Sequence, residues 1–278
     1  MLTLLYGGFV FCIIWLEGSD KMIKIIFSDF DNTMLNYYSE NNYFDEYKIS
    51  IFKRLRDKGI KFCIVTGRGV SFFERFPNLL EVIDYIAGSN GSCIYDVRNK
   101  KYLFHEEIDS DILNGLIAYL IKNNYSFILN CKELRYRYGD MIADDVIDYD
   151  CDKDYSCEQV IVRTLDNETG KLFNHLENVK DIGINNIATW NGYFTIDINK
   201  KIVSKGWAIR LLCDYLNIDV NDAMAFGDGV NDKSMFEVVS KGMAVGNAVS
   251  KLKTFSKDVV LDCKNDGMYK YIEKNILK

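Results

Sequence analysis

The stretch Ile23-Lys24-Ile25-Ile26-Phe27-Ser28-Asp29-Phe30-Asp31-Asn32-Thr33 decides the fold of this 278-residue chain. Its first half is apolar except for Lys24 and predicts a buried strand. Its second half places two carboxylates two residues apart where that strand ends. Crowded carboxylates beside a buried strand need compensation, usually a divalent cation, and a site rich in oxygen suits Mg²⁺. The stretch therefore predicts metal-dependent chemistry at the carboxyl end of a central strand.

Three further motifs supply groups that fit the same chemistry. Gly227-Asp228-Gly229-Val230-Asn231-Asp232 follows a short apolar strand candidate, Val65-Thr66-Gly67-Arg68 ends another, and Ser204-Lys205-Gly206 opens a helix. Carboxylates hold a metal, Lys and Thr bind phosphate oxygens, and glycines let backbone N–H groups approach the phosphate. In open α/β sheets such groups converge beyond the carboxyl ends of the strands. Together these motifs indicate phosphoryl transfer.

In their order along the chain, the four motifs resemble those of the haloacid dehalogenase superfamily of phosphohydrolases, most closely its Cof-type branch, class IIB. Ser89-Asn90-Gly91 and the run from Ala244 to Ala248 are also typical of that branch. The resemblance spans roughly residue 22 to the C-terminus. It implies an α/β fold with a doubly wound, Rossmann-like parallel-sheet core and an inserted α+β cap domain that closes over the site.

The order of elements along the chain predicts the same organisation. Core strands are expected at 23–28, 60–65, 82–87, 223–227, 242–245 and 258–261, with helices at 44–58, 205–216 and 232–239 and a short one from 248. A hairpin is expected at 92–96 and 101–105. The middle of the chain predicts helices at 108–124 and 168–178 with strands at 126–131, 134–138, 159–164, 184–190 and 193–198. We therefore expect a core of residues 22–106 and 199–278, a cap of residues 107–198, and an apolar N-terminal extension of residues 1–21.

The resemblance assigns a role to each motif residue. Asp29 is the expected nucleophile, Asp31 the general acid and base, and Lys205 the cation that faces both phosphate and Asp29. The expected metal ligands are Asp29, Asp31 through its backbone carbonyl, Asp228, and Asp232, which holds a metal water or Lys205. The expected phosphate or substrate contacts are Thr66, Gly67, Arg68, Asn90, Gly91 and Asn231.

Simpler roles remain open for several of these residues. Asp29 and Asp31 are also common at strand ends and in turns, and Asn231 and Asp232 suit the start of a helix. Asn32 replaces the commoner Gly of the motif, and Asn tolerates left-handed backbone. In the cap, the polar or aromatic residues Arg135, Arg137, Trp190 and Asn191 lie near strand ends without an assigned role. His105 and His175 lie outside every motif and are expected at the surface or in packing contacts. The acidic run 144–154 is expected to be a solvated face.

Composition limits the kinds of partner and the cellular location that we expect for this protein. The net charge of −6 argues against a nucleic-acid partner. The eight cysteines form no CxxC pair, and several lie in apolar runs, which indicates reduced thiols in the cytoplasm. Residues 2–16 are mostly apolar but short for a bilayer span, so we expect an over-extended start or dispensable tail, with a membrane tether as the alternative. The sequence does not fix the oligomeric state.

The expected function is Mg²⁺-dependent hydrolysis of small phosphomonoesters, such as sugar phosphates or phosphorylated cofactors, through an aspartyl-phosphate. One alternative is a phosphotransferase or phosphomutase on the same scaffold. The other is a non-catalytic sensor of a phosphorylated metabolite, which would have no need of Asp31.

Overall fold

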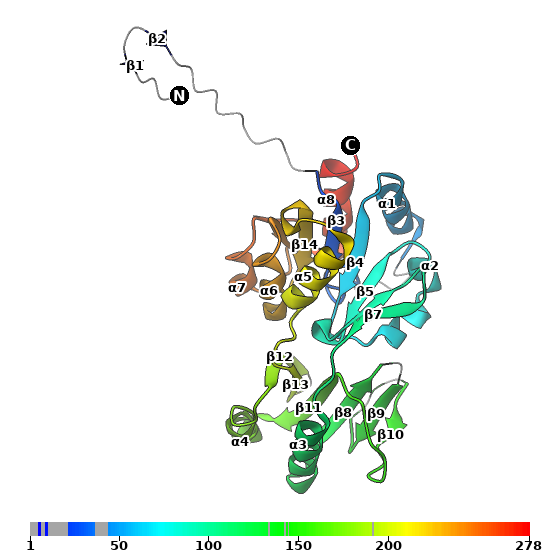
Figure 1. Cartoon of the computed structure of the whole chain (residues 1–278), viewed down its shortest axis with the longest axis vertical. Helices are drawn as coiled ribbons and strands as arrows, with labels where there is room; N and C mark the ends of the chain where they lie inside the picture. Colours follow the sequence, from blue (N-terminus) through cyan, green and yellow to red (C-terminus); the bar gives the residue numbers. More distant parts are fainter. Residues whose placement is uncertain are drawn as a thin grey trace.

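The computed structural model describes residues 22–36, 44–132, 134–141, 143, 145–190 and 192–278. It also describes the backbone of a short antiparallel pair, β1 (Leu5–Tyr6) and β2 (Phe9–Val10). The rest of the predicted N-terminal extension, Asn191, and the side chain of Trp190 lie outside the described residues. Two sheets with their helices form the body of the molecule (Figure 1).

The larger sheet has eight strands in the order β16-β15-β14-β3-β4-β5-β6-β7. The strands are β3 (Ile25–Ser28), β4 (Lys61–Val65), β5 (Tyr85–Gly88), β6 (Cys93–Asp96), β7 (Lys101–His105), β14 (Ala223–Gly227), β15 (Lys241–Ala244) and β16 (Asp258–Val259). Neighbours from β16 to β5 run parallel, whereas β5, β6 and β7 pair antiparallel. Since β3 lies between β14 and β4, the carboxyl ends of the three motif-bearing strands are adjacent.

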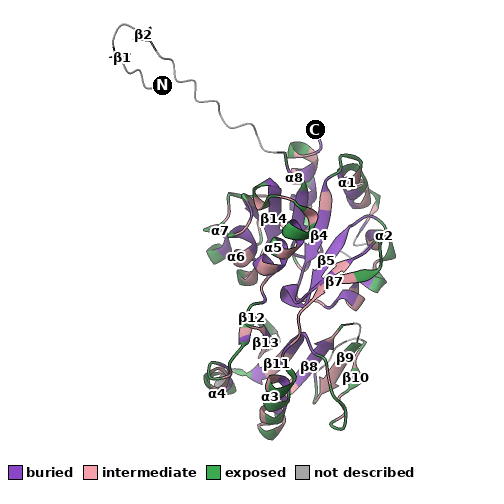
Figure 2. Cartoon of the chain, in the orientation of Figure 1, coloured by how far each residue is buried: buried purple, intermediate pink, exposed green. Residues whose placement is uncertain are grey.

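The central strands are buried on both faces, which explains their unbroken apolar sequence. On β3, Ile26 packs into one hydrophobic cluster with the helices α1 (Glu46–Asp57) and α8 (Gly267–Asn275). Ile25 and Phe27 pack into another with α5 (Lys205–Leu216) and α6 (Lys233–Phe236). Strand side chains alternate between faces, so each face needs its own cover of helices. Figure 2 shows these strands buried between the helices. The predicted doubly wound core is confirmed.

Polar side chains cap the N-termini of the two longest helices that pack on the larger sheet. Asp45 accepts the N–H of Lys48 at the start of α1 (Glu46–Asp57), and Ser204 accepts the N–H of Trp207 at the start of α5 (Lys205–Leu216). The other helices are α2 (Pro77–Leu80), α6 (Lys233–Phe236), α7 (Ser250–Lys253) and α8 (Gly267–Asn275), with 3₁₀ turns η1 (Val70–Arg75), η2 (Ser89–Gly91), η3 (Val220–Asp222), η4 (Val230–Asp232) and η5 (Cys263–Asn265).

The smaller sheet has six strands in the order β10-β9-β8-β11-β13-β12, all antiparallel except the β10–β9 pair. They are β8 (Ser126–Cys131), β9 (Leu134–Tyr138), β10 (Ile147–Asp148), β11 (Gln159–Leu165), β12 (Ile182–Trp190) and β13 (Tyr193–Lys200). Helices α3 (Ser110–Lys122) and α4 (Asp166–Leu176) cover one face through a third hydrophobic cluster. On β13, Ile196 and Ile198 face that cluster, so Thr195 and Asp197 face the other way.

Sequence patterns and structure differ in a few elements. The helix expected at 232–239 is the η4 turn followed by the four-residue α6. β10 and α8 were not predicted, because β10 lies in a polar acidic stretch and α8 begins at a glycine. Five of the described cysteines are buried, as expected, but Cys151 is exposed.

Candidate active site at the carboxyl edge of the larger sheet

Asp29 and Lys205 meet at the centre of the site. Asp29 follows β3 directly, and its backbone N–H donates to the carbonyl of Phe226 on β14 (2.9 Å). Lys205, the first residue of α5, places Nζ 2.5 Å from Asp29 Oδ1 and 2.6 Å from Asp232 Oδ1. All three side chains are buried. The ammonium therefore neutralises part of the negative charge that surrounds the proposed nucleophile.

Three carboxylates crowd this point. Asp29, Asp228 and Asp232 each offer an oxygen within 4.8 Å of the others, a spacing that could hold one metal ion. Burial raises the pKa of Asp29 well above its usual range despite Lys205, and Asp232 and Asp228 raise it further. Burial and repulsion from Asp232 raise the pKa of Asp228 to about 7. The site thus holds more negative charge than Lys205 offsets, which fits a bound divalent cation.

Asp232 holds the motif loop together. Its Oδ2 accepts the backbone N–H groups of Asp228 (2.8 Å) and Gly229 (2.9 Å), while Oδ1 accepts from Lys205. Burial would lower the pKa of Lys205, but the charges of Asp232 and Asp29 outweigh it and raise that pKa. Asp232 therefore positions Asp228 and keeps Lys205 charged, in addition to standing among the candidate ligands.

Asp31 lies beside the three carboxylates rather than among them. Arg68 binds its carboxylate in a bidentate pair: Nε donates to Oδ2 at 3.1 Å and Nη2 donates to Oδ1 at 2.9 Å. The guanidinium also stacks over the ring of Phe72, at 4.4 Å from the ring centroid. Asn32, which directly follows Asp31, adopts φ 60°, the left-handed conformation that its residue type permits.

Three other predicted phosphate-binding residues, Thr66, Asn90 and Asn231, are connected to Arg68 through hydrogen bonds. Thr66 is buried, its carbonyl accepts the N–H of Asn90 (2.8 Å), and its Oγ1 accepts the N–H of Arg68 (3.2 Å). Asn90 donates to Asp197 Oδ2 (2.9 Å) and accepts from Asn231 (3.3 Å).

The two glycines serve different purposes. Gly91 has φ 101°, and a Cβ there would lie 2.6 Å from the carbonyl oxygen of Ser204, so it allows the β5–β6 connection to touch the start of α5. Gly67 instead lines the cavity described next.

A cavity of about 1150 Å³ opens between the two sheets. From the larger sheet it is lined by Asp29, Asp31, Gly67, Arg68, Asp228 and Asn231, and from the smaller one by Asn130, Arg135, Ile161, Asn186, Thr195 and Asp197. Lys205, Thr66, Asn90, Gly91 and Asp232 lie behind this surface rather than on it. The structure therefore brings the predicted site residues to one place. Some of them line the cavity, and the others lie behind the lining residues, which Lys205, Thr66 and Asp232 contact.

The sequence analysis missed Asp197. It is buried on β13, and burial raises its pKa to about 6, although bonds from Asn90 and Asn186 and the charges of Lys205 and Arg68 act the other way. Alternation along β13 marks Asp197 as facing away from the apolar layer, which is the signal that could have found it. Of the unassigned cap residues, Arg135 lines the cavity, whereas Arg137 pairs with the exposed Asp148.

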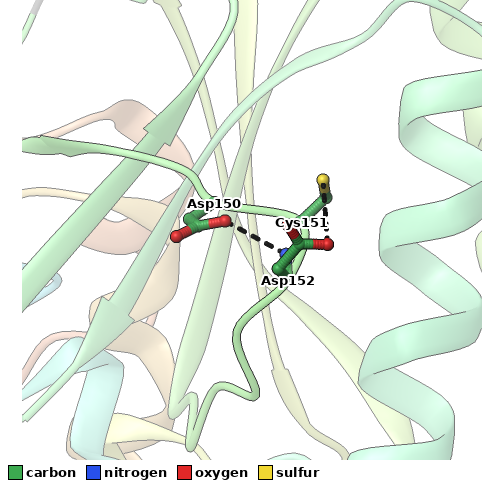
Figure 3. A group of neighbouring side chains, drawn as sticks. All are labelled: Asp150, Cys151 and Asp152. Carbon is green, nitrogen blue, oxygen red and sulfur yellow. Dashed lines mark hydrogen bonds between the residues drawn. The ribbon is translucent and has the colours of Figure 1, made fainter.

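A second acidic group lies far from this site in the sequence, in the turn Asp150-Cys151-Asp152 (Figure 3). Asp150 Oδ1 accepts the N–H of Asp152 (3.1 Å), and Cys151 Sγ donates to Asp152 Oδ1 (3.9 Å), so the bonds drawn run within the turn itself. Asp150 also faces Lys153 at 3.4 Å. These contacts fit a solvated turn, as the sequence predicted for this acidic run.

Comparison with known proteins identifies the family. The family model of the haloacid dehalogenase-like hydrolases matches residues 26–272. The chain is 26% identical to the phosphatase YwpJ of Bacillus subtilis, over 88% of this chain and 97% of that protein. It is also 26% identical to the 5-amino-6-(5-phospho-D-ribitylamino)uracil phosphatase YcsE of the same organism, over 94% of this chain and 99% of that one.

Solved structures agree on the fold. BT1666 from Bacteroides thetaiotaomicron, a phosphatase of this superfamily, superposes with a TM-score of 0.78 at 22% identity, covering 94% of this chain and 98% of that one. The subclass IIB sugar phosphatase BT4131 superposes with a TM-score of 0.75 at 19% identity, covering 92% and 100%.

The chain belongs to the haloacid dehalogenase-like hydrolases, and its fold is that of subclass IIB. It is an enzyme of the phosphatase class. Among the described residues, none of the helices is both long enough and apolar enough to span a bilayer.

Proposed function

We propose that this protein hydrolyses small phosphomonoesters with Mg²⁺ through an aspartyl-phosphate intermediate. The observation that carries the proposal is the position of Asp29. It is a buried carboxylate on the cavity wall, 2.5 Å from the ammonium of Lys205 and close to two further carboxylates. A carboxylate attacks phosphorus when nearby cations neutralise the approach of two anions.

The chain's own residues account for the two steps. Asp29 attacks the phosphorus while the bond to the leaving oxygen breaks, and Asp31 protonates that oxygen. Asp31 then takes a proton from water, which attacks the aspartyl-phosphate and releases inorganic phosphate and free Asp29. In the structure both oxygens of Asp31 are engaged by Arg68. A phosphate dianion in the cavity competes for that guanidinium, so substrate binding would release Asp31 for proton transfer.

Mg²⁺ suits the donor set. Asp29 and Asp228 would hold it, with the carbonyl of Asp31 as the family resemblance implies, and Asp232 would fix the loop that carries Asp228. The ion supplies positive charge to the phosphoryl oxygens.

The polar cavity suits a small phosphorylated metabolite. Residues 107–198 would act as the cap that covers the site, since Asn130, Asn186 and Asp197 face the catalytic wall. Of the relatives, YcsE is named for a phosphorylated ribitylamino-uracil, and BT4131 is described as a sugar phosphatase. We therefore propose a polyhydroxylated phosphomonoester as substrate, in the cytoplasm.

The test is phosphate release from p-nitrophenyl phosphate and a panel of phosphorylated metabolites, with Mg²⁺ and with EDTA. Asp29→Asn should lower kcat by at least ~10³-fold, whereas Asp150→Asn, an equally conservative change in the distant acidic turn, should leave it unchanged. Turnover that persists in Asp29→Asn or in EDTA would contradict the proposal. Phosphate recovered on an added sugar rather than in solution would identify a phosphotransferase instead.

A further inference from the structure

Two neighbouring residues behind the site hold a backbone conformation that side chains rarely adopt. Ser89 has φ 50° and Asn90 has φ 57°, both in the left-handed region. Asn tolerates this region, but Ser does so less readily, so the strain of the turn η2 lies mainly at Ser89 and must be held by its surroundings. Asn90 contacts Asn231 of the metal-binding loop and Asp197 of the cavity wall, so the shape of this turn affects the site.

The smaller sheet supplies much of what holds this turn. Ser89 Oγ donates to Glu158 Oε1 at 2.6 Å, Asn199 Nδ2 donates to the Ser89 carbonyl at 2.9 Å, and Asn90 donates to Asp197 at 2.9 Å. Glu158 directly precedes β11, and Asn199 lies on β13. The core contributes two backbone bonds, from Ser89 to the Arg68 carbonyl and from Asn90 to the Thr66 carbonyl.

Glu158 is an unusual residue for this position. Its side chain is fully buried, and a buried carboxylate requires a partner. His105, at the end of β7, places Nε2 2.5 Å from Glu158 Oε2 and Nδ1 2.9 Å from Glu107 Oε1. Each ring nitrogen of His105 therefore faces a carboxyl group, one of them buried. The proposed phosphatase chemistry uses neither Glu158 nor His105.

We propose that Glu158 is a positioning residue for the phosphatase reaction: through Ser89 it fixes the strained turn that places Asn90 against Asn231. His105 contacts the other oxygen of Glu158 and so ties β7 to the same carboxyl group. The arrangement couples the docking of the smaller sheet to the geometry of the site, because Glu158 belongs to one and Ser89 to the other. The inference rests on the phosphatase activity of the protein.

A double-mutant cycle on the full-length protein tests this role. Glu158→Ala and Ser89→Ala should each lower kcat about tenfold with KM within about threefold, because the lost contact acts on the transition state. The double variant should be no worse than the poorer single variant, since both remove the same bond. Affinity for orthovanadate, which mimics the five-coordinate phosphorus, should fall by the same factor as kcat.

Two matched variants separate positioning from stability. Glu158→Gln keeps an oxygen for Ser89 and places an amide beside His105 Nε2, so kcat should stay within about threefold of wild type. Glu107→Gln changes the other carboxylate on His105, which does not contact Ser89, and should leave kcat unchanged.

Three results would overturn the proposal: folded Glu158→Ala with kcat within twofold of wild type, multiplicative losses in the double variant, or a Glu158→Gln variant as slow as Glu158→Ala. If Glu158→Ala does not fold, Ser89→Ala decides alone, and a kcat within twofold of wild type overturns the role. A wild-type protein without turnover or vanadate binding would instead count against the proposed function.

Discussion

At the scale of single residues, Arg68 and Arg75 offer a matched pair. Both guanidinium groups stack over Phe72, each with its central carbon 4.4 Å from the ring centroid. Both side chains line the cavity, but Arg68 binds Asp31, whereas Arg75 pairs with Asp145, whose side chain is 80% exposed. Stacking on Phe72 is therefore common to both arginines, whereas the bidentate contact with Asp31, the proposed general acid, is made by Arg68.

We expect Arg68→Ala to lower kcat/KM by about 10- to 100-fold, mostly through KM, because the variant loses the cation that the phosphate attracts. Arg75→Ala should change kcat/KM less than about threefold, since exposed ion pairs contribute little. Steady-state kinetics on one substrate measure both. Equal losses in the two variants would show that Phe72 stacking, not the Asp31 contact, is what matters.

Asp197 should cost stability at neutral pH. Its pKa is about 6 in the folded protein, because burial raises it from the usual value near 4. The folded state thus binds this proton more tightly than the unfolded chain, and stability falls as pH rises from about 4 to about 6. Above that range the full cost, roughly 1–3 kcal/mol, is present.

The variant Asp197→Asn should therefore unfold at higher urea concentration than wild type at pH 8 and at the same concentration at pH 4. Other groups titrate alike in both proteins, so the difference isolates Asp197. The same variant should lose kcat/KM on the preferred metabolite, because it changes the cavity wall. A stability difference that is the same at pH 4 and pH 8 would contradict this account.

Local sequence motifs identified most of the candidate catalytic residues but not the residues that hold them in position. Asp29, Asp31, Asp228 and Lys205 stand at strand ends or a helix start, where a short motif is informative. Asp197 and Glu158 act through contacts with residues 107 and 69 positions away. Neither lies in a motif, and periodicity shows only which face of a strand a residue occupies. The Arg68–Asp31 pair was also missed, since Arg68 was expected to contact phosphate or substrate.

At the scale of elements, the joint between α5 and α6 depends on a glycine. A Cβ on Gly206 would lie 2.2 Å from the Ser234 carbonyl oxygen, which is backbone and has no room to shift cheaply. Gly206 also donates its N–H to Ser234 Oγ at 3.1 Å. The preceding residue is Lys205, so this contact sets the position of the ammonium that faces Asp29 and Asp232.

Gly206→Ala should destabilise the fold by about 2–4 kcal/mol and lower kcat of the folded fraction, because α5 must move away from α6. Gly115→Ala is the control: its Cβ meets no atom within 4 Å in the middle of α3, and it should raise stability by about 0.5–1 kcal/mol. Thermal unfolding of both variants measures the signs. A neutral or stabilising Gly206→Ala would show that the two helices are free to separate.

Strands of the core were easier to predict than its short helices. β3, β4 and β14 are apolar runs that end in motif residues, so pattern and position agree. The expected helix at 232–239 breaks after α6, at a point that no sequence pattern marks. In the smaller sheet, β8 and β9 begin and end where the alternation predicts. β10 has two exposed residues and no alternation to read.

At the scale of the whole molecule, the site is made by two sheets that fold as separate layers. In the proposed function the larger sheet supplies the reacting groups, and the smaller sheet supplies both the opposite cavity wall and contacts that hold the turn η2. Polar residues on the face of the smaller sheet that α3 and α4 leave uncovered, such as Thr195 and Asp197, line the cavity. The chain's overall net charge of −6 adds to the local excess of carboxylates.

This excess of negative charge makes the response to Mg²⁺ a test of the whole arrangement. In EDTA, Asp29, Asp228 and Asp232 repel one another, and burial together with that repulsion raises the pKa of Asp228 to about 7. Mg²⁺ that binds the folded state alone should stabilise it by about 2–3 kcal/mol at a hundredfold excess over Kd. We expect Tm of the wild type to rise by several degrees on addition of Mg²⁺.

The Tm of Asp228→Asn relative to that of the wild type should depend on whether Mg²⁺ is present. The variant removes one repelling charge, so its Tm in EDTA should equal or exceed that of the wild type, but it also removes a ligand, so Mg²⁺ should leave its Tm unchanged. The two proteins should therefore exchange rank when Mg²⁺ replaces EDTA, a result that a purely structural aspartate would not give. A wild-type Tm that is identical in EDTA and in Mg²⁺ would mean that the three carboxylates do not form a metal site. Lys205 alone would then have to offset their charge.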